Sequence, residues 1–418
     1  MDTTRADHCS VYGYKSDTTP NLRAFAEEAT VFDSAYSPTA ETGPSHATMF
    51  TSLYPISHSL AKNGLKLNKD YECLAEILKN RGYQTAAVIS SFVLDAKFGL
   101  AQGFEYYDDD FSRSISTMHR NKWQGHAVTG GFDRRAGEVT GSTLRWLKFR
   151  QDSNSPFFLF IHYFDPHAPY VPPVSYASRF MPKNVSPLEK VIARYDGEVA
   201  YTDHEVGQVL QTLKQTGLEK NTIVIITSDH GEGLMQRGHM EHGVHIYEEA
   251  VRVPLMFRWP GRIKKRRTLT TPTGLVCITP TILDLAGIDP KNWPFHGQSL
   301  AANLRNDIPP DDNRPVYLLR CHYDGFIGDQ KIWAKGEKFG IRLGKWKYIE
   351  GEEENTKELF DLEEDPKELN NLYSELLDKA TEFSLQLKNW LKSYRKAKPE
   401  IKIDKEDIEK LRTLGYVE

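Results

Sequence analysis

The sequence has few cysteines, no long apolar run and no strong excess of charge of one sign. Its four cysteines lie far apart along the 418 residues and form no CxxC pair. We therefore expect neither a disulfide framework nor a thiolate zinc site, although the sequence still allows a single disulfide bridge. No run of about 18 apolar residues is present, so the sequence predicts no transmembrane segment.

The balance of charge argues against nucleic acid as a partner. The formal net charge is −4, and the longest basic run covers only residues 264–267. Such a run is more typical of a solvated loop than of a binding patch. The chain opens with polar residues, so no signal peptide is evident, and the location of the protein stays undetermined.

Apolar runs alternate with helical patterns through the first 305 residues. Four segments are predicted to be buried strands: residues 85–90, 157–162, 222–228 and 253–257. Three segments between them are predicted to be helices, each ended by a glycine: residues 71–81, 188–216 and 278–286. This alternation predicts an α/β domain with a largely parallel sheet.

The texture of the sequence changes near residue 305. Residues 306–314 form a polar segment with two prolines, which is typical of a linker. Strand-like runs at 316–320 and 339–349 follow, and then an acidic stretch and an amphipathic helical pattern over 372–395. We therefore divide the chain into a catalytic domain, residues 1–305, and a smaller α+β subdomain, residues 306–418.

The segment after Met1 is expected to follow a strand, because ligands of open α/β sheets lie at the carboxyl ends of strands. Only Met1 precedes Asp2 in this sequence. We therefore expect the first strand either to lie upstream of Met1 or to be lost, and we favour an upstream start.

The clearest chemical signal follows the third apolar run. Asp229 and His230 stand at the end of that run, before a glycine, and further histidines follow at 239, 242 and 245. A carboxylate and an imidazole at the end of a strand are suitable metal ligands. A single histidine here would more often be a hydrogen-bonded loop residue, but four histidines beside a strand-end Asp favour a site.

Two other segments give weaker evidence for a functional site when each is considered alone. Asp2, Arg5 and Asp7 near the terminus are typical of surface residues, and Thr42 and Ser45 precede a predicted helix. A hydroxyl residue in that position usually caps the helix.

Together, and in this order, the segments resemble the sulfatase family of the alkaline phosphatase superfamily. The resemblance rests on residues 2–14 (DTTRADHCSVYGY), 42–55 (TGPSHATMFTSLYP), 228–232 (SDHGE) and 242–261 (HGVHIYEEAVRVPLMFRWPG). Residues 162–170 (HYFDPHAPY), 195–203, 360–372 and 411–417 also fit, so it spans nearly the whole chain.

The resemblance implies an α/β/α sandwich with a mostly parallel sheet and a C-terminal subdomain that carries an antiparallel sheet. It also implies a divalent cation, which would be zinc, manganese or calcium, held by Asp2, Thr42, Asp229 and His230. His167 and His242 would hold the ester oxygens or protonate the leaving group. The predicted substrate-binding residues are His46, Lys62, Asn63 and Asp165, and the substrate would be a small-molecule or glycan ester.

Three departures from the family pattern bear on the chemistry. Classical sulfatases carry Cys or Ser, oxidised to formylglycine, where this sequence has Thr42. The methyl group on the Cβ of threonine prevents oxidation to an aldehyde. Thr42 therefore cannot expel sulfate by elimination, as the hydrated aldehyde of classical sulfatases does. His46 replaces the usual Arg, and His230 replaces the common Asn, which favours zinc or manganese over calcium.

We therefore predict a metal-dependent hydrolase in which a threonine alkoxide attacks phosphorus or sulfur. The chemistry of Thr42 favours phosphate or phosphonate esters, and the family label favours sulfate. Asp165, His167 and His242 are a possible second cation site. The alternatives are a transferase that passes the Thr42 intermediate to another hydroxyl, and an inactive metal-binding homologue.

Overall fold

The computed structural model describes residues 1–58, 60–111, 122–123, 126–127, 132–150, 153–306, 308–327, 330–394 and 409. The sequence motif at residues 411–417 lies outside this part of the chain. Among the described residues, no helix has both the length and the apolar character that crossing a membrane requires.

The large sheet is built from two groups of strands. The first group has the order β3 (Tyr106–Asp108), β2 (Gln84–Val88), β6 (Phe157–Ile161), and all its strands are parallel. The second has the order β11 (Arg267–Leu269), β1 (Thr30–Tyr36), β10 (Arg252–Arg258), β7 (Val224–Thr227), and β12 (Thr273–Gly274) also pairs with β1. Only β10 runs antiparallel to its neighbours in these groups, so the predicted mostly parallel sheet is confirmed.

Helices cover both faces of these strands, as the α/β/α prediction required. Helices α1 (Pro20–Ala26), α4 (Ala136–Phe149) and α6 (Pro187–Gln215) pack on one face. Helices α2 (Thr42–Thr51) and α8 (Ile278–Leu285) pack on the other, with α3 (Leu74–Lys79) beside α8. Neighbouring strand residues point to opposite faces: Val31 and Met256 belong to the first core, Phe32 and Leu255 to the second.

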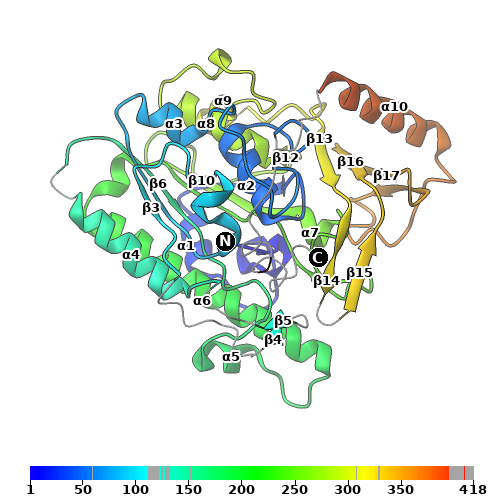
Figure 1. Ribbon diagram of the computed structural model, residues 1–418, viewed down its shortest axis with the longest axis horizontal. Helices are drawn as coiled ribbons and strands as arrows, with labels where there is room; N and C mark the ends of the chain where they lie inside the picture. The colour runs from blue at the N-terminus through cyan, green and yellow to red at the C-terminus, as the bar shows by residue number, and fades with distance from the viewer. Residues whose placement is uncertain are drawn as a thin grey trace.

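The C-terminal region carries the expected antiparallel sheet. Its order is β13 (Val316–Arg320), β16 (Lys338–Leu343), β17 (Trp346–Gly351), β18 (Thr356–Asp361). Figure 1 shows this sheet in yellow and orange at one side of the molecule, with α10 (Leu377–Ser393) beside it. A further hairpin joins β14 (Tyr323–Ile327) to β15 (Gln330–Ala334).

Two predicted segments differ in detail. The strand-like run 339–349 is a hairpin, because the chain turns at Gly344, whose φ is 56°. The last helix begins at Leu377 rather than at 372, because the Leu372 amide donates to the Leu359 carbonyl at 2.8 Å and holds this segment against β18. The remaining short elements are α5 (Val174–Phe180), α7 (Glu248–Val251), α9 (Ala301–Arg305), β4 (Lys122–Trp123), β5 (His126–Ala127), β8 (Gly233–Leu234) and β9 (Met240–Glu241).

Candidate functional site

The carboxyl ends of β6 and β7 bring the first residues of the chain to Asp229. Met1 donates its amino group to the Thr227 carbonyl at 3.0 Å, and the Asp2 amide donates to the Tyr163 carbonyl at 2.7 Å. The Thr3 amide donates to Asp229 Oδ1 at 3.2 Å. These bonds place the carboxyl groups of Asp2 and Asp229 in one buried space, although 226 positions separate Asp229 from Thr3.

Helix α2 brings Thr42 to the same place. Thr42 is the first residue of this helix, and Glu41 occupies the N-cap position, so neither Thr42 nor Ser45 caps the helix. Ser45 instead donates its hydroxyl to the Asp229 carbonyl at 2.7 Å. Thr42 Oγ1 lies 3.2 Å from Nε2 of His230, and both side chains are fully buried.

Two carboxylate oxygens at this centre have no hydrogen-bond partner. Asp2 Oδ1 and Asp229 Oδ2 are both buried and unpaired. They lie 3.9 Å and 3.5 Å from Nε2 of His230, and the three atoms fall within 4.8 Å of one another. Unpaired buried oxygens are costly, and a cation among them would remove that cost.

The ring orientation of His230 is set by its own loop. Its Nδ1 lies 2.9 Å from the Gly231 carbonyl, which can only accept, so the proton resides on Nδ1. Nε2 therefore carries a lone pair towards Asp2, Asp229 and Thr42. A ring held by a backbone carbonyl on its far side is a common arrangement for metal-binding histidines.

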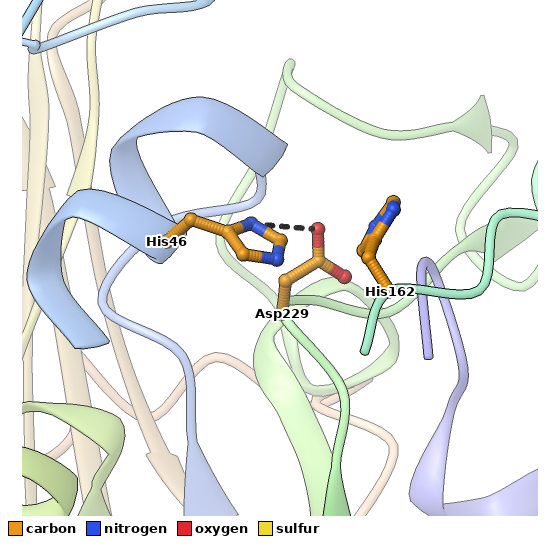
Figure 2. Close-up of side chains that lie close together, drawn as sticks. All are labelled: His46, His162 and Asp229. Atoms are coloured by element: carbon orange, nitrogen blue, oxygen red, sulfur yellow. Dashed lines mark ion pairs between the residues drawn. The ribbon is translucent and has the colours of Figure 1, made fainter. Parts of the chain in front are cut away.

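A second group of possible ligands shares Asp229 with the first. It consists of His46 on α2, His162 after β6, and Asp229 after β7, and all three side chains are buried. Figure 2 shows the two rings on either side of the Asp229 carboxylate, with His46 Nδ1 at 3.8 Å from Asp229 Oδ2. His46 Nδ1 donates to the Thr42 carbonyl at 2.7 Å, so its Nε2 is the free ring nitrogen.

Sequence reasoning did not single out His162. Its Nε2 lies 3.1 Å from Asp2 Oδ2, and its Nδ1 lies 3.0 Å from the Ser90 hydroxyl. The position of His162 in the sequence could have indicated its role. His162 comes directly after the apolar strand β6, as Asp229 comes shortly after the apolar strand β7. Both strands end at the same edge, where ligands of such sheets collect.

His167 and His242 lie beside the metal-type cluster. The ring centres of His242 and His230 are 4.4 Å apart, and those of His242 and His167 are 4.9 Å apart. His242 Nδ1 lies 3.0 Å from Glu232 Oε1, and Glu232 is fully buried. The structure therefore places both predicted histidines next to the centre that holds Thr42, and adds Glu232 as their support.

The four predicted substrate-binding residues occupy different surroundings. His46 lies in the buried centre described above, and Lys62 is exposed. Asn63 is buried and accepts a hydrogen bond from the Gly43 amide through Oδ1 at 2.8 Å. Asp165 accepts from the Ala136 amide at 2.8 Å and pairs with Arg135 at 3.4 Å.

The possible second cation site is not assembled in the part of the chain that the structure describes. Two groups of three or more ligand-type side chains were found there, and neither includes Asp165, His167 or His242. Asp165 points to the start of α4, where Arg135 and the Ala136 amide bind it. The sequence could not show this, because the partners lie 29 and 30 positions away.

Burial and neighbouring charges shift the pKa values of the carboxyl groups at this centre. It raises the pKa of Asp2 well above its ordinary value, and the neighbouring Asp229 carboxylate raises it further. Burial also raises the pKa of Glu232, to about 8. The pKa of Asp229 is lowered even though burial opposes this, because His230, His46 and His162 surround it.

Burial also keeps four histidines of the centre neutral: His46, His162, His167 and His242. Burial lowers the pKa of His46 and of His162 to about 3, and that of His242 to about 4. Burial lowers the pKa of His167 well below its ordinary value, and the nearby His242 adds to the effect. Neutral imidazoles keep a lone pair for a cation or a proton.

Comparison with known proteins identifies a family for most of the chain. The family model described as Sulfatase matches residues 1–288, and one described as N-sulphoglucosamine sulphohydrolase, C-terminal, matches residues 240–397. An ulvan-active sulfatase of Formosa agariphila is 27% identical over 86% of this chain and 74% of its own length. An N-acetylglucosamine-6-O-sulfatase of Bacteroides thetaiotaomicron is 24% identical over 96% of this chain and 86% of its own.

Solved structures share the fold over almost the whole chain. One, a complex with its substrate D-glucosamine-2-N,6-O-disulfate, has a TM-score of 0.77 at 22% identity, covering 96% of this chain and 98% of its own. The phosphonate monoester hydrolase of Agrobacterium radiobacter has a TM-score of 0.76 at 20% identity, covering 94% of both chains. At this identity the likeness shows a common fold.

Proposed function

The chain belongs to the sulfatase family, whose members hydrolyse sulfate esters, and we propose that it uses a divalent cation and Thr42 to cleave phosphate or phosphonate esters. One observation supports this most directly. The Thr42 hydroxyl lies 3.2 Å from His230 Nε2, beside two unpaired buried carboxylate oxygens. A nucleophile and a set of ligands thus share one closed space.

The residues present fit a divalent cation. Two carboxylate oxygens without a hydrogen-bond partner and the Nε2 atom of His230 converge within 4.8 Å, and the Thr42 hydroxyl lies 3.2 Å from that nitrogen. The predicted set of Asp2, Thr42, Asp229 and His230 would hold the ion, and His46 and His162 stand next to it. Mixed nitrogen and oxygen ligands suit zinc or manganese. A bound cation lowers the pKa of a nearby hydroxyl and neutralises negative charge on ester oxygens.

The protein itself fixes the nucleophile. Thr42 is held at the first position of α2, and its side chain is fully buried. The hydroxyl of Ser45 donates to the Asp229 carbonyl, so the helix cannot shift away from the end of β7 without breaking that bond. Asn63 accepts from the Gly43 amide and ties the first turn of the helix to the loop that follows it. In the first step Thr42, after its hydroxyl proton has passed to water, bonds through its oxygen to phosphorus while the bond to the leaving oxygen breaks. Water then cleaves the phosphothreonine.

His242 is placed to donate the proton that the leaving oxygen needs. Its Nδ1 lies 3.0 Å from Glu232 Oε1, and its ring lies beside that of His230, with ring centres 4.4 Å apart. Because burial raises the pKa of Glu232 to about 8, Glu232 would pass its own proton to Nδ1 as Nε2 gives a proton to the leaving oxygen. The ring centre of His167 lies 4.9 Å from that of His242, and His167 would hold an ester oxygen.

The choice of phosphorus rests on Thr42. A threonine cannot form the aldehyde that classical sulfatases use, and a covalent threonine ester would have to be opened by water. That step is accessible for a phosphate ester and slow for a sulfate ester. The likeness to phosphonate monoester hydrolases is consistent with this choice, and the relatives that act on glycans suggest a glycan or small-molecule alcohol as the leaving group.

A parallel assay tests the proposal. The unmodified chain and the Thr42→Ala and Thr42→Ser variants are compared on an aryl sulfate, a phosphate monoester, a phosphodiester and a phosphonate monoester, with zinc, manganese or calcium. Thr42→Ala should lose on the order of 1,000-fold or more in kcat while keeping its metal. Thr42→Ser keeps the hydroxyl and should retain most turnover.

Four outcomes would contradict parts of this picture. Full activity of Thr42→Ala would end the covalent scheme. Faster cleavage of the sulfate ester than of every phosphorus ester would overturn the choice of phosphorus. A chain that holds its metal but turns over none of the four esters would be an inactive binding homologue, and capture of the intermediate by added alcohol rather than water would indicate a transferase.

A further inference from the structure

Three basic side chains gather beside the hairpin that precedes His242. Strands β8 and β9 form this hairpin, and its turn carries Arg237 and His239. The turn is fixed, because the Met235 amide donates to the His239 carbonyl at 2.8 Å. His245 follows His242 by three positions, and its ring centre lies 5.0 Å from that of His239. We call Arg237, His239 and His245 the basic cluster.

The ring of His245 is buried with both of its polar atoms unused. The residue is only 3% exposed, and among the described residues neither Nδ1 nor Nε2 has a hydrogen-bond partner. Its ring centre lies 5.2 Å from that of Tyr247. A neutral imidazole has one N–H donor and one acceptor nitrogen. Because buried polar groups are nearly always bonded, these two nitrogens indicate a place where a ligand binds.

Arg237 has an unused donor in the same place. Its guanidinium lies over the Tyr247 ring, 3.8 Å from the ring centre, and Nη1 is buried with no partner in the part of the chain that the structure describes. Its Nη2 lies 3.9 Å from Glu358 Oε1, which is beyond hydrogen-bond distance. Glu358 accepts instead from the Tyr247 hydroxyl at 2.8 Å. The stacked guanidinium is therefore held in place and can still bind an oxyanion.

The charges that act on His245 are positive. Burial lowers its pKa well below its ordinary value, and nearby basic groups lower it further: His239, Lys347, Arg237 and Lys338. Carboxylates already bind both lysines, at 2.7 Å between Lys338 and Glu354 and at 2.9 Å between Lys347 and Glu368. The lysines therefore add positive potential but are not counted as ligands. Unused donors in a positive potential favour an anion.

The basic cluster and the proposed catalytic centre share one loop. The ring centre of His242 lies 4.4 Å from that of His230, and His245 is only three positions further along. Three residues span at most about 11 Å, so one small molecule can reach both places. His239 is exposed, so solvent and ligands reach the basic cluster.

We propose that Arg237, His239 and His245 bind a second acidic group of the substrate, a carboxylate, sulfate or phosphate that is not itself cleaved. This inference rests on the proposed function, because it concerns the far end of the molecule whose ester lies at Thr42. Arg237 Nη1 and one ring nitrogen of His245 would donate charge-assisted hydrogen bonds to the same group. The preferred substrate would then be an ester whose alcohol part is itself negatively charged.

Two matched sets of phosphonic acids test the inference on the metal-loaded protein. ω-Carboxyalkylphosphonates with two to eight methylene groups are compared with alkylphosphonates of equal length, and neither set contains an ester that could be cleaved. For at least one length the carboxylate should tighten binding by about 10-fold or more, as measured by calorimetry.

Variants at two solvent-accessible positions assign that gain. Arg237→Gln and His239→Asn should each remove most of it and change the affinity for alkylphosphonates by less than about 2-fold. Arg262→Gln is the control and should keep the gain, because Arg262 also lies over a ring, that of Trp259, but at an exposed position elsewhere.

Equal affinity for the two sets at every chain length would overturn the proposal, and so would a gain that survives in both variants. If neither set binds, the proposed function fails, and the basic cluster is tested by itself with inorganic sulfate. The ring nitrogen signals of His245 are then followed by NMR. A shift that Arg237→Gln weakens supports an anion site, and no shift at about 50 mM sulfate rejects it.

Discussion

At the scale of single residues, the site depends on buried polar atoms that the protein leaves unpaired. Asp2 Oδ1 and Asp229 Oδ2 lack hydrogen bonds, because neighbouring donors bind other acceptors. The Thr3 amide donates to Asp229 Oδ1, and His46 Nδ1 donates to the Thr42 carbonyl. Leaving such oxygens unpaired costs about 1–3 kcal/mol each. That cost is understandable if a cation occupies the space.

Removing one of these oxygens should remove the metal. We expect Asp229→Asn to lose at least about 100-fold in metal affinity, because an amide is a neutral and weaker ligand. Metal content after dialysis and kcat with each cation measure this. Asp17→Asn is the matched control, since Asp17 pairs with Arg23 at the surface. Unchanged metal content in Asp229→Asn would contradict the assignment.

The role given to His242 predicts a dependence on the leaving group. His242→Ala should lower kcat by about 100-fold or more on esters of poorly acidic alcohols, because these need a proton when they depart. Esters of 4-nitrophenol leave without help and should lose far less. A loss of equal size on both substrates would mean that His242 binds the ester and does not protonate it. His204→Ala, at an exposed position of α6, is the control.

At the scale of elements, the first turn of α2 is positioned by contacts from the following loop. Glu41 at its N-cap accepts from the Asn63 amide at 2.9 Å, and Asn63 Oδ1 accepts from the Gly43 amide at 2.8 Å. Burial raises the pKa of Glu41 to about 7. These reciprocal bonds hold the helix that carries Thr42 and His46.

Asn63→Ala should therefore destabilise the fold. The Gly43 amide would be left buried without an acceptor, at a cost of roughly 1–3 kcal/mol in the free energy of unfolding. Urea denaturation measures this cost, and Asn68→Ala serves as control, because Asn68 Oδ1 binds an exposed amide. Unchanged stability together with a raised KM would instead support the predicted substrate contact of Asn63.

At the scale of the whole molecule, the proposed catalytic domain and C-terminal subdomain share one core. The same apolar cluster contains Phe50 and Leu285 from the first region and Leu319 and Trp390 from the second. The ring of Trp390 stacks on Tyr317 at 4.2 Å and meets Tyr54 edge-on at 5.3 Å. A boundary at residue 305 stays a prediction about chain organisation, and these contacts argue that the two regions unfold together.

A buried ion cluster joins the same two regions. The Lys347 ammonium is fully buried and lies 2.9 Å from Glu368 Oε1 and 3.0 Å from Glu248 Oε1. Lys347→Met would leave both carboxylates without their cation and should cost about 3–5 kcal/mol in the free energy of unfolding. Denaturation followed by fluorescence and by circular dichroism should give coincident transitions at a lower midpoint. Lys388→Met, at an exposed position of α10, should change the midpoint little, and two separate transitions would contradict the shared core.

The sequence by itself determined the local features. Short apolar runs bounded by turn residues favour strands, so β2, β6, β7 and β10 were predictable within one or two residues. The prediction that all four are buried was wrong for β6 and most of β7, whose residues are only partly buried. The end of a strand is also a local property, which is why Asp229 and His230 stood out. Motif resemblance added Asp2, Thr42, His167 and His242, and the structure brings these around His230.

Only the tertiary structure decided which side chains meet and which are used elsewhere. His162 reaches Asp2 across 160 positions, whereas Asp165 turns away to Arg135 and the start of α4. Nothing in the neighbouring sequence distinguishes these two outcomes, because the lateral order of strands is set by pairing between distant segments. The same holds for the cavity that β6 and β7 line: each strand is readable from its own residues, but the space between them is defined only once both strands are placed.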